Sequence, residues 1–160
     1  MKKTVIAIIG AGRIAESNHL PALSKMENVR VKYVCDYFLD KAKDLKEKFP
    51  IIENAVSNAD EVLNDSEVEG VFIFTPNRFH YEIGMKALAS NKHVFCEKPI
   101  ANTYAQALEM ANEAKKRNLT LNEIYPDITN SFFMEGDVII PDAKPDVDNI
   151  LFVDALPVID

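Results

Sequence analysis

Two glycines near the start of the chain stand in a pattern that can bind phosphate. Gly10 and Gly12 belong to the stretch G-x-G-x-x-A, which follows an apolar run and opens a helix-like segment. In that setting Gly10 allows a tight turn, Gly12 lets the backbone approach a pyrophosphate, and Ala15 lets the helix pack close to the strand. The helix N-terminus then offers N–H groups and a positive dipole end to the phosphates. The alternative is a buried strand followed by an ordinary glycine turn.

An acidic residue closes the second apolar run of the chain. Asp36 follows that run directly. A carboxylate at this point accepts hydrogen bonds from the hydroxyls of an adenosine ribose and repels a 2′-phosphate. Together with the glycines, it predicts a dinucleotide cofactor, with NAD favoured over NADP. The alternative is that Asp36 only caps the next helix.

Polar residues also follow the fourth apolar run. Thr75, Pro76 and Asn77 come at the carboxyl end of that run, which is where parallel sheets collect their active sites. Asn77 could equally cap the helix that follows. His80 lies one turn further, on the apolar face of that helix, as either a packing histidine or a cofactor contact. The spacing leaves these roles open.

A lysine in a turn is the fourth candidate for chemistry. Glu97, Lys98 and Pro99 follow the fifth apolar run. A lysine at this edge could donate or accept a proton in a reaction. The alternative is a solvated loop lysine, and the spacing alone does not exclude it.

These candidates need elements that bring them to one edge of a sheet. Apolar runs alternate with amphipathic stretches along residues 1–123. The expected strands cover residues 4–9, 29–35, 51–52, 70–74, 93–96 and 119–121, and the expected helices cover 12–25, 39–49, 57–63, 77–90 and 103–118. Pro21 is expected to break or kink the first helix. Continuous apolar strands are typical of a sheet covered on both faces, so the pattern predicts an α/β fold with a doubly wound parallel sheet (Rossmann).

The last part of the chain breaks this alternation. Residues 124–160 contain four prolines and many aspartates and have no helical period. We expect an extended tail rich in Pro and Asp, or an incomplete second module, after a cofactor-binding domain at residues 1–123.

Composition excludes several classes of function. The net charge is −7 and no cluster of Lys and Arg stands out, so nucleic acid is not an expected partner. The apolar run at residues 5–9 is too short for a signal peptide and is soon followed by Arg13 and Glu16. No run approaches the roughly 20 apolar residues of a membrane span. Cys35 and Cys96 lie in apolar runs, which predicts reduced, buried thiols in a cytoplasmic protein. We expect no metal site.

Three stretches together resemble one enzyme family. They are IIGAGRIAESNHLPAL, CD at positions 35–36, and FTPNRFHYEIGMKALASNKHVFCEKPIANTYAQALEMANEAKKRN. The combination of TPN..H with EKP is far more specific than the glycine pattern. Over residues 3–122 the chain resembles the amino-terminal domain of the Gfo/Idh/MocA oxidoreductases, relatives of glucose–fructose oxidoreductase and inositol dehydrogenase. The resemblance implies a Rossmann fold that binds NAD(P), and hydride transfer from a sugar or cyclitol alcohol to the nicotinamide.

The resemblance also implies a role for each matching residue. The pyrophosphate would be lined by Gly10, Gly12, Arg13 and Ile14, and the adenosine ribose would be bound by Asp36. The nicotinamide half would be flanked by Thr75, Pro76, Asn77 and His80. The nicotinamide ribose and the substrate hydroxyl would be reached by Glu97 and Lys98, of which Lys98 is the family's catalytic lysine.

The resemblance stops before the family's second domain. Family members continue with an α/β domain that holds the substrate and supports oligomers, which implies a sugar or cyclitol substrate and a homo-oligomer. No such domain is recognisable after residue 123, and LTLNEIYPDITN replaces the expected run toward an arginine and a proline. We therefore expect a truncated oxidoreductase that binds NAD with little or no turnover on its own.

Two other functions stay open. A non-catalytic protein that senses NAD(H) could use residues 124–160 to contact a partner. An S-adenosylmethionine methyltransferase would also use a glycine turn and an acidic residue after the second strand, although EKP argues against it. The stretch EGDVIIPDAKPDVDNILFVDA resembles the opening of SPOCS-type modules of spore-forming bacteria, which implies a cofactor domain joined to a fragment of an unrelated module.

Overall fold

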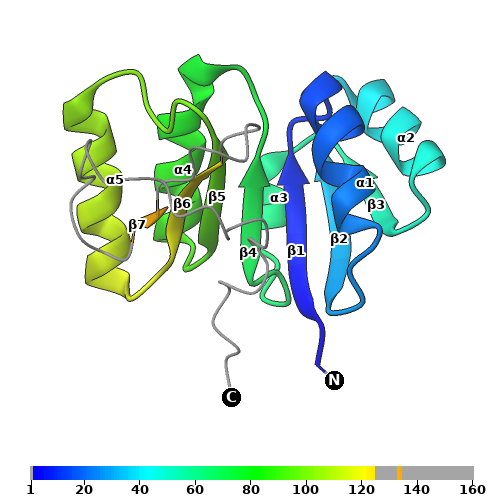
Figure 1. Cartoon of the computed structure of the whole chain (residues 1–160), viewed down its shortest axis with the longest axis horizontal. Coiled ribbons are helices and arrows are strands. Elements are labelled where there is room, and N and C mark those ends of the chain that lie inside the picture. The colour runs from blue at the N-terminus through cyan, green and yellow to red at the C-terminus, as the bar shows by residue number, and fades with distance from the viewer. Residues whose placement is uncertain (1, 125–132, 135–160) are drawn as a thin grey trace. The chain divides into compact units, whose positions relative to one another are not determined.

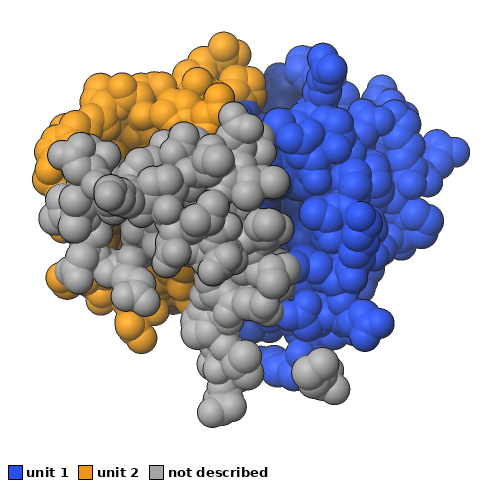
Figure 2. Space-filling model, in the orientation of Figure 1, with its two compact units in different colours: residues 1–75 blue, residues 76–160 orange. Residues whose placement is uncertain are grey.

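The computed structural model describes residues 2–124 and 133–134. The chain divides into two compact units, residues 1–75 and 76–160, which are coloured separately in Figure 2. Apart from residues 124 and 133–134, the tail considered above lies outside the described residues. The domain boundary between residues 123 and 124 therefore stays a prediction, as does the resemblance of the tail to SPOCS-type modules.

Four parallel strands form the centre of the first unit. They are β1 (Thr4–Ile9), β2 (Val29–Cys35), β3 (Ile52–Val56) and β4 (Gly70–Ile73). Their order is β3-β2-β1-β4, with β1 between β2 and β4 (Figure 1). The chain leaves β1 toward β2 on one side and returns through β4 on the other. This reversal is the switch point of a doubly wound sheet, the place where such sheets bind ligands.

The helices of the first unit include one turn of unusual width. A π-helical turn at Ala15–His19 runs into α1 (Leu20–Leu23), and α2 (Leu39–Lys48) and α3 (Ala59–Leu63) both contact β2. The expected kink in the second half of the first helix is thus a π turn before the proline. Pro21 has no N–H to donate, and the wider turn leaves it in the first turn of α1, where no donor is needed.

The second unit continues the alternation of strand and helix. A 3₁₀ turn at Asn77–Phe79 leads into α4 (His80–Ala89), followed by β5 (His93–Glu97), α5 (Tyr104–Arg117), β6 (Leu121–Ile124) and β7 (Phe133–Met134). Strands β5 and β6 are parallel, and β7 pairs with β6 in the antiparallel sense. Helix α4 contacts β5 and α5, and α5 also contacts β6. Within the described part of the chain, every helix is too short or too polar to span a bilayer.

Strands β1, β4 and β5 are buried at nearly every position. Ile6, Ala7 and Ile8 of β1 have no exposed surface, and neither do Val71 of β4 and Phe95 of β5. Burial at consecutive positions means that helices cover both faces of the sheet, as in parallel α/β sheets. The predicted fold class, a doubly wound α/β sheet of the Rossmann type, is confirmed.

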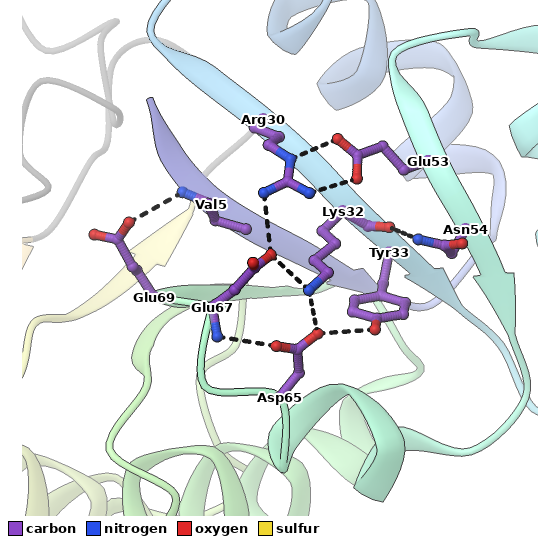
Figure 3. A network of polar contacts seen from close by, with 9 residues as sticks. All are labelled: Val5, Arg30, Lys32, Tyr33, Glu53, Asn54, Asp65, Glu67 and Glu69. Atoms are coloured by element: carbon purple, nitrogen blue, oxygen red, sulfur yellow. Dashed lines mark hydrogen bonds and ion pairs between the residues drawn. The ribbon is translucent and has the colours of Figure 1, made fainter. Parts of the chain in front are cut away.

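A network of ion pairs ties β2 to β3 and to the loop before β4 (Figure 3). The Arg30 guanidinium donates to both carboxylate oxygens of Glu53, at 2.6 and 2.8 Å, and to Glu67 at 3.1 Å. The Lys32 ammonium lies 2.5 Å from Asp65 and 2.7 Å from Glu67. The hydrogen bond from Lys32 is the largest cause that lowers the pKa of Asp65, to about 2. This network is structural, because it joins strands and a loop through paired charges.

Candidate functional site

The fold itself requires the first glycine of the turn after β1. Gly10 has a φ of +106°, in the left-handed region. A Cβ at this position would lie 2.6 Å from the carbonyl carbon of Phe74 and 2.7 Å from the backbone nitrogen of Thr75. The Gly10 N–H donates to the Cys35 carbonyl at 2.7 Å. The turn is therefore packed directly against the ends of β2 and β4.

The second glycine has no such structural reason. A Cβ on Gly12 would meet no atom within 4 Å among the residues that the structure describes. Exposed Arg13 and half-buried Ile14 follow in helical conformation, and N–H groups of a first helical turn have no acceptor within the helix. Open space before a helix N-terminus fits an anionic group, here the pyrophosphate that the glycine pattern predicts.

Asp36 connects the end of β2 to the glycine turn. Its Oδ2 accepts a hydrogen bond from the Ala11 N–H at 2.8 Å, and its Oδ1 accepts one from the Phe38 N–H at 2.9 Å. Phe38 is the N-cap residue of α2, and its own side chain makes no capping hydrogen bond. The alternative that Asp36 only caps this helix is wrong, because the carboxylate holds the turn that follows β1. Each carboxylate oxygen keeps a second lone pair for a ligand hydroxyl.

Sequence reasoning missed a ring stack beside this turn. The His19 imidazole stacks on Phe74 with the ring centroids 4.1 Å apart and the planes 8° from parallel. Phe74 follows β4, and its N–H donates to the Ile9 carbonyl at 2.8 Å. Because the π turn decides where His19 points, spacing at the usual helical period could not find this contact. Pro21 is the one signal in the sequence that marks the region as irregular.

The second unit opens with two exposed residues of the predicted site, Pro76 and Asn77. Asn77 begins the 3₁₀ turn, and the N-cap residue of α4 is Phe79, whose own side chain makes no capping hydrogen bond. The alternative that Asn77 caps the helix is therefore wrong, since α4 begins only at His80. Thr75, the last residue of the first unit, is half-buried.

His80 is fully buried at the start of α4. It has no exposed surface, and its Nδ1 lies 2.7 Å from the carbonyl oxygen of Pro99. Since a carbonyl only accepts hydrogen bonds, Nδ1 must be the donor and carry the proton. His80 thus contacts the turn that carries Lys98, and its expected place beside a nicotinamide stays a prediction.

The turn after β5 presents a lysine from a fixed backbone. Glu97 is buried, and its Oε2 accepts a hydrogen bond from the Lys98 N–H at 3.2 Å. Lys98 itself is exposed, and its peptide bond to Pro99 is cis. The Ile100 N–H donates to Oε1 of Glu123 in β6 at 2.8 Å. No motif in the sequence singled out Glu123, whose partner Ile100 lies in the turn after β5.

Both cysteines, Cys35 and Cys96, are buried free thiols, as predicted. Burial, with a smaller contribution from Asp36, raises the pKa of Cys35 to about 11. Burial also raises the pKa of Cys96 well above its ordinary value, and nearby Glu123 adds to this. These thiols are protonated and inert near neutral pH. Among the described residues, no group of three or more His, Cys, Asp or Glu could hold a metal ion.

The predicted site residues thus gather in two places, one in each unit. In the first unit, hydrogen bonds and packing join the glycine turn to Asp36 and to the end of β4. In the second, His80 and Glu97 hold the turn around Lys98. The first place is a glycine turn of the kind that binds phosphate, at the switch point of the sheet. The second is the turn after the parallel strand β5, which presents Lys98.

Comparison with known proteins identifies the family to which the chain belongs. The model of an oxidoreductase family with an NAD-binding Rossmann fold matches residues 4–125. The chain belongs to the Gfo/Idh/MocA family. The predicted resemblance is confirmed, and so is NAD as the type of cofactor that the family's matching domain binds.

Curated relatives resemble this chain over most of its length. The chain is 37% identical to the D-glucoside 3-dehydrogenase of Escherichia coli over 111 residues, which cover 69% of this chain and 31% of that enzyme. It is 36% identical to the inositol 2-dehydrogenase of Salmonella typhimurium over 112 residues, or 69% of this chain and 33% of that enzyme. The chain therefore spans about a third of the length of the curated relatives it matches.

Solved structures agree with this assignment. A 3-ketoreductase from Actinomadura kijaniata, in complex with NADP and TDP-benzene, superposes with a TM-score of 0.72 and 30% identity, over 76% of this chain and 38% of that one. An NAD-binding oxidoreductase from Klebsiella pneumoniae gives a TM-score of 0.69 and 29% identity, over 80% and 36%.

Proposed function

We propose that this chain binds NAD(H) at the glycine turn and forms the cofactor half of a dehydrogenase. The observation that carries the proposal is the contrast between the two glycines. The fold accounts for Gly10 through its φ and its contact with Phe74, whereas Gly12 faces open space. A glycine that its own fold does not need, at the N-terminus of a helix, is explained by the close approach of a pyrophosphate.

Each residue of the first unit has a defined part in this proposal. Gly10, Gly12, Arg13 and Ile14 line the pyrophosphate, with the N–H groups of the first helical turn as donors. Asp36 accepts hydrogen bonds from the adenosine ribose through its remaining lone pairs. A 2′-phosphate would bring negative charge against this carboxylate, so NADH binds more tightly than NADPH.

The residues around the second turn serve the nicotinamide half. Thr75, Pro76, Asn77 and His80 flank this half, and Glu97 and Lys98 reach its ribose and the substrate. When bound, the nicotinamide supplies a hydride acceptor for an alcohol carbon. Lys98 then takes or returns the proton of the alcohol hydroxyl, and its exposed side chain is accessible for that contact.

The relatives suggest the substrate class. Their names state a glucoside and an inositol, so we propose a sugar or cyclitol alcohol, and a homo-oligomeric, cytoplasmic enzyme. Hydride transfer needs the substrate held about 3–3.5 Å from the reacting carbon. Because these residues match about a third of each relative, we expect the chain alone to bind cofactor with little turnover.

A second candidate is an NAD(H)-binding protein without catalysis that contacts a partner through its tail. This candidate uses the same cofactor turn, in which Gly12 faces open space, and requires no substrate site. A change of oligomeric state on adding NADH, without oxidation of any polyol, would support this candidate over the first.

Calorimetric titration with NADH and with NADPH tests the proposal. The expected result is one site per chain for NADH and an affinity at least about tenfold lower for NADPH, a difference of ~1.4 kcal/mol. A folded sample that binds neither dinucleotide at millimolar concentration would rule the proposal out. Tighter binding of S-adenosylmethionine than of NADH would instead favour a methyltransferase.

A further inference from the structure

One peptide group beside Lys98 is held at both of its ends. The carbonyl oxygen of Pro99 accepts a hydrogen bond from Nδ1 of His80 at 2.7 Å. The N–H of Ile100, which belongs to the same peptide group, donates to Oε1 of Glu123 at 2.8 Å. This peptide bond is trans, so its oxygen and its hydrogen point in opposite directions. His80 and Glu123 therefore hold it from opposite sides.

The two side chains come from different elements and are both buried. His80 is the first residue of α4 and has no exposed surface, while Glu123 lies in β6 with 8% of its surface exposed. A buried imidazole or carboxylate is costly unless it is hydrogen-bonded. The contacts with the peptide group account for one hydrogen bond of each. The turn is thereby joined to a helix and to a strand of the second unit.

The lysine has a fixed backbone and an exposed side chain. Its N–H donates to the Glu97 carboxylate at 3.2 Å, and the peptide group held by His80 and Glu123 lies one residue further along the chain. A lysine side chain is long and flexible, so the place of its ammonium depends on where its Cα is held. A displacement of 1 Å at a reacting group can reduce a rate about a hundredfold.

We propose that His80 and Glu123 are positioning residues for Lys98. They hold the peptide group after Pro99 and so set the point from which the lysine reaches the nicotinamide half of the cofactor. Neither side chain needs to touch the cofactor for this role. The inference rests on the proposed function of Lys98 and adds Glu123, which no sequence motif indicated.

Paired variants at each position separate a hydrogen bond from simple packing. His80→Asn places an amide N–H near Nδ1, whereas His80→Gln places it near Nε2, and His80→Leu has no donor. Glu123→Gln keeps an acceptor, and Glu123→Leu has none. Glu82→Gln, on the exposed side of α4, is the matched control. Each variant is titrated with NADH and with ADP-ribose, which lacks the nicotinamide.

Loss of either hydrogen bond is expected to weaken the binding of NADH but not that of ADP-ribose. His80→Leu, His80→Gln and Glu123→Leu should lower the NADH affinity by at least about fivefold, ~1 kcal/mol, and leave ADP-ribose unchanged. His80→Asn and Glu123→Gln should keep an NADH affinity close to that of the wild type. In a Lys98→Ala background the same substitutions should have no further effect on NADH, because they act through the lysine.

Several results would overturn this inference. One is an equal loss of affinity for NADH and for ADP-ribose. Others are an unchanged NADH affinity in the Leu variants, or a loss of NADH affinity that persists in the Lys98→Ala background. If the Leu variants do not fold, the NADH affinities of His80→Asn and His80→Gln are compared instead. Equal affinities in these two variants would reject the positioning role of His80. Failure of the wild type to bind NADH would reject the proposed function itself, which is a different outcome.

Discussion

The carboxylate of Asp36 accepts a hydrogen bond from the Ala11 N–H at 2.8 Å, which ties the end of β2 to the glycine turn after β1. Its other oxygen accepts the Phe38 N–H at 2.9 Å. The residue proposed to bind the adenosine ribose therefore also holds the turn proposed to bind the pyrophosphate. A substitution at this position should affect both the shape of the site and its choice of cofactor.

Replacing Asp36 tests this double role. Asp36→Asn keeps one carbonyl oxygen as an acceptor but removes the charge that repels a 2′-phosphate. We expect the NADH preference over NADPH to fall by about tenfold, ~1.4 kcal/mol, measured as the ratio of the two dissociation constants. Asp36→Ala should weaken both dinucleotides, because the turn loses its anchor. Asp40 is an exposed acid on α2, and the control Asp40→Asn should change neither dissociation constant. An unchanged ratio of the two constants in Asp36→Asn would contradict the ribose assignment.

Gly10 should matter for folding more than any other residue of the turn. Gly10→Ala places a Cβ 2.6 Å from the backbone of Phe74 at a φ of +106°. We expect the free energy of unfolding to fall by about 2–4 kcal/mol, measured by urea denaturation. Gly12→Ala, whose Cβ meets no described atom, should change it by less than about 1 kcal/mol. Equal losses in the two variants would show that the turn is packed differently.

The Lys32–Asp65 pair should make stability depend on pH in acid. Asp65 has a pKa of about 2 in the folded protein against 3.8 for the free group. A lowered pKa stabilises the folded state above pH 4, and this contribution is lost as the pH falls from about 4 toward 2. Asp65→Asn should therefore cost about 1 kcal/mol at pH 6, and progressively less below pH 4. The comparison is made by urea unfolding, with exposed Asp44→Asn as the control; a cost that does not shrink in acid would refute the pairing.

The buried thiols should react only when the protein unfolds. The pKa of Cys35 is raised to about 11, and that of Cys96 is raised as well, in both cases chiefly by burial. At pH 8 both groups are protonated and shielded, so a disulfide reagent should react slowly with the folded protein and rapidly in urea. The rate is followed by absorbance, and fast labelling of the native protein would contradict the buried placement.

The sequence predicted those features that depend on local pattern. Both β1 and β2 were expected at residues 4–9 and 29–35, where the structure has them, because continuous apolar runs mark buried parallel strands. The expected strand at 51–52 extends to Val56, although its later residues are exposed or half-exposed. Partial burial on an outer strand weakens the apolar signal from which strands are predicted.

Contacts between distant elements could not be predicted from one sequence. The π turn changes where His19 points, and a single extra residue per turn leaves no mark in apolar spacing. Glu123 meets Ile100 only because β6 lies beside β5. The alternative that Asn77 caps a helix is wrong for a related reason, since α4 begins only at His80.

Titration of NADH into the wild type and Gly12→Ala, side by side, tests the central claim most directly. The claim is that the open space at Gly12 receives the cofactor's pyrophosphate. The wild type should bind one NADH per chain, and the added methyl should weaken binding by at least about tenfold, ~1.4 kcal/mol, while the urea midpoint stays close to that of the wild type. Equal NADH affinity in the two proteins, or no binding by either in the folded state, would contradict it.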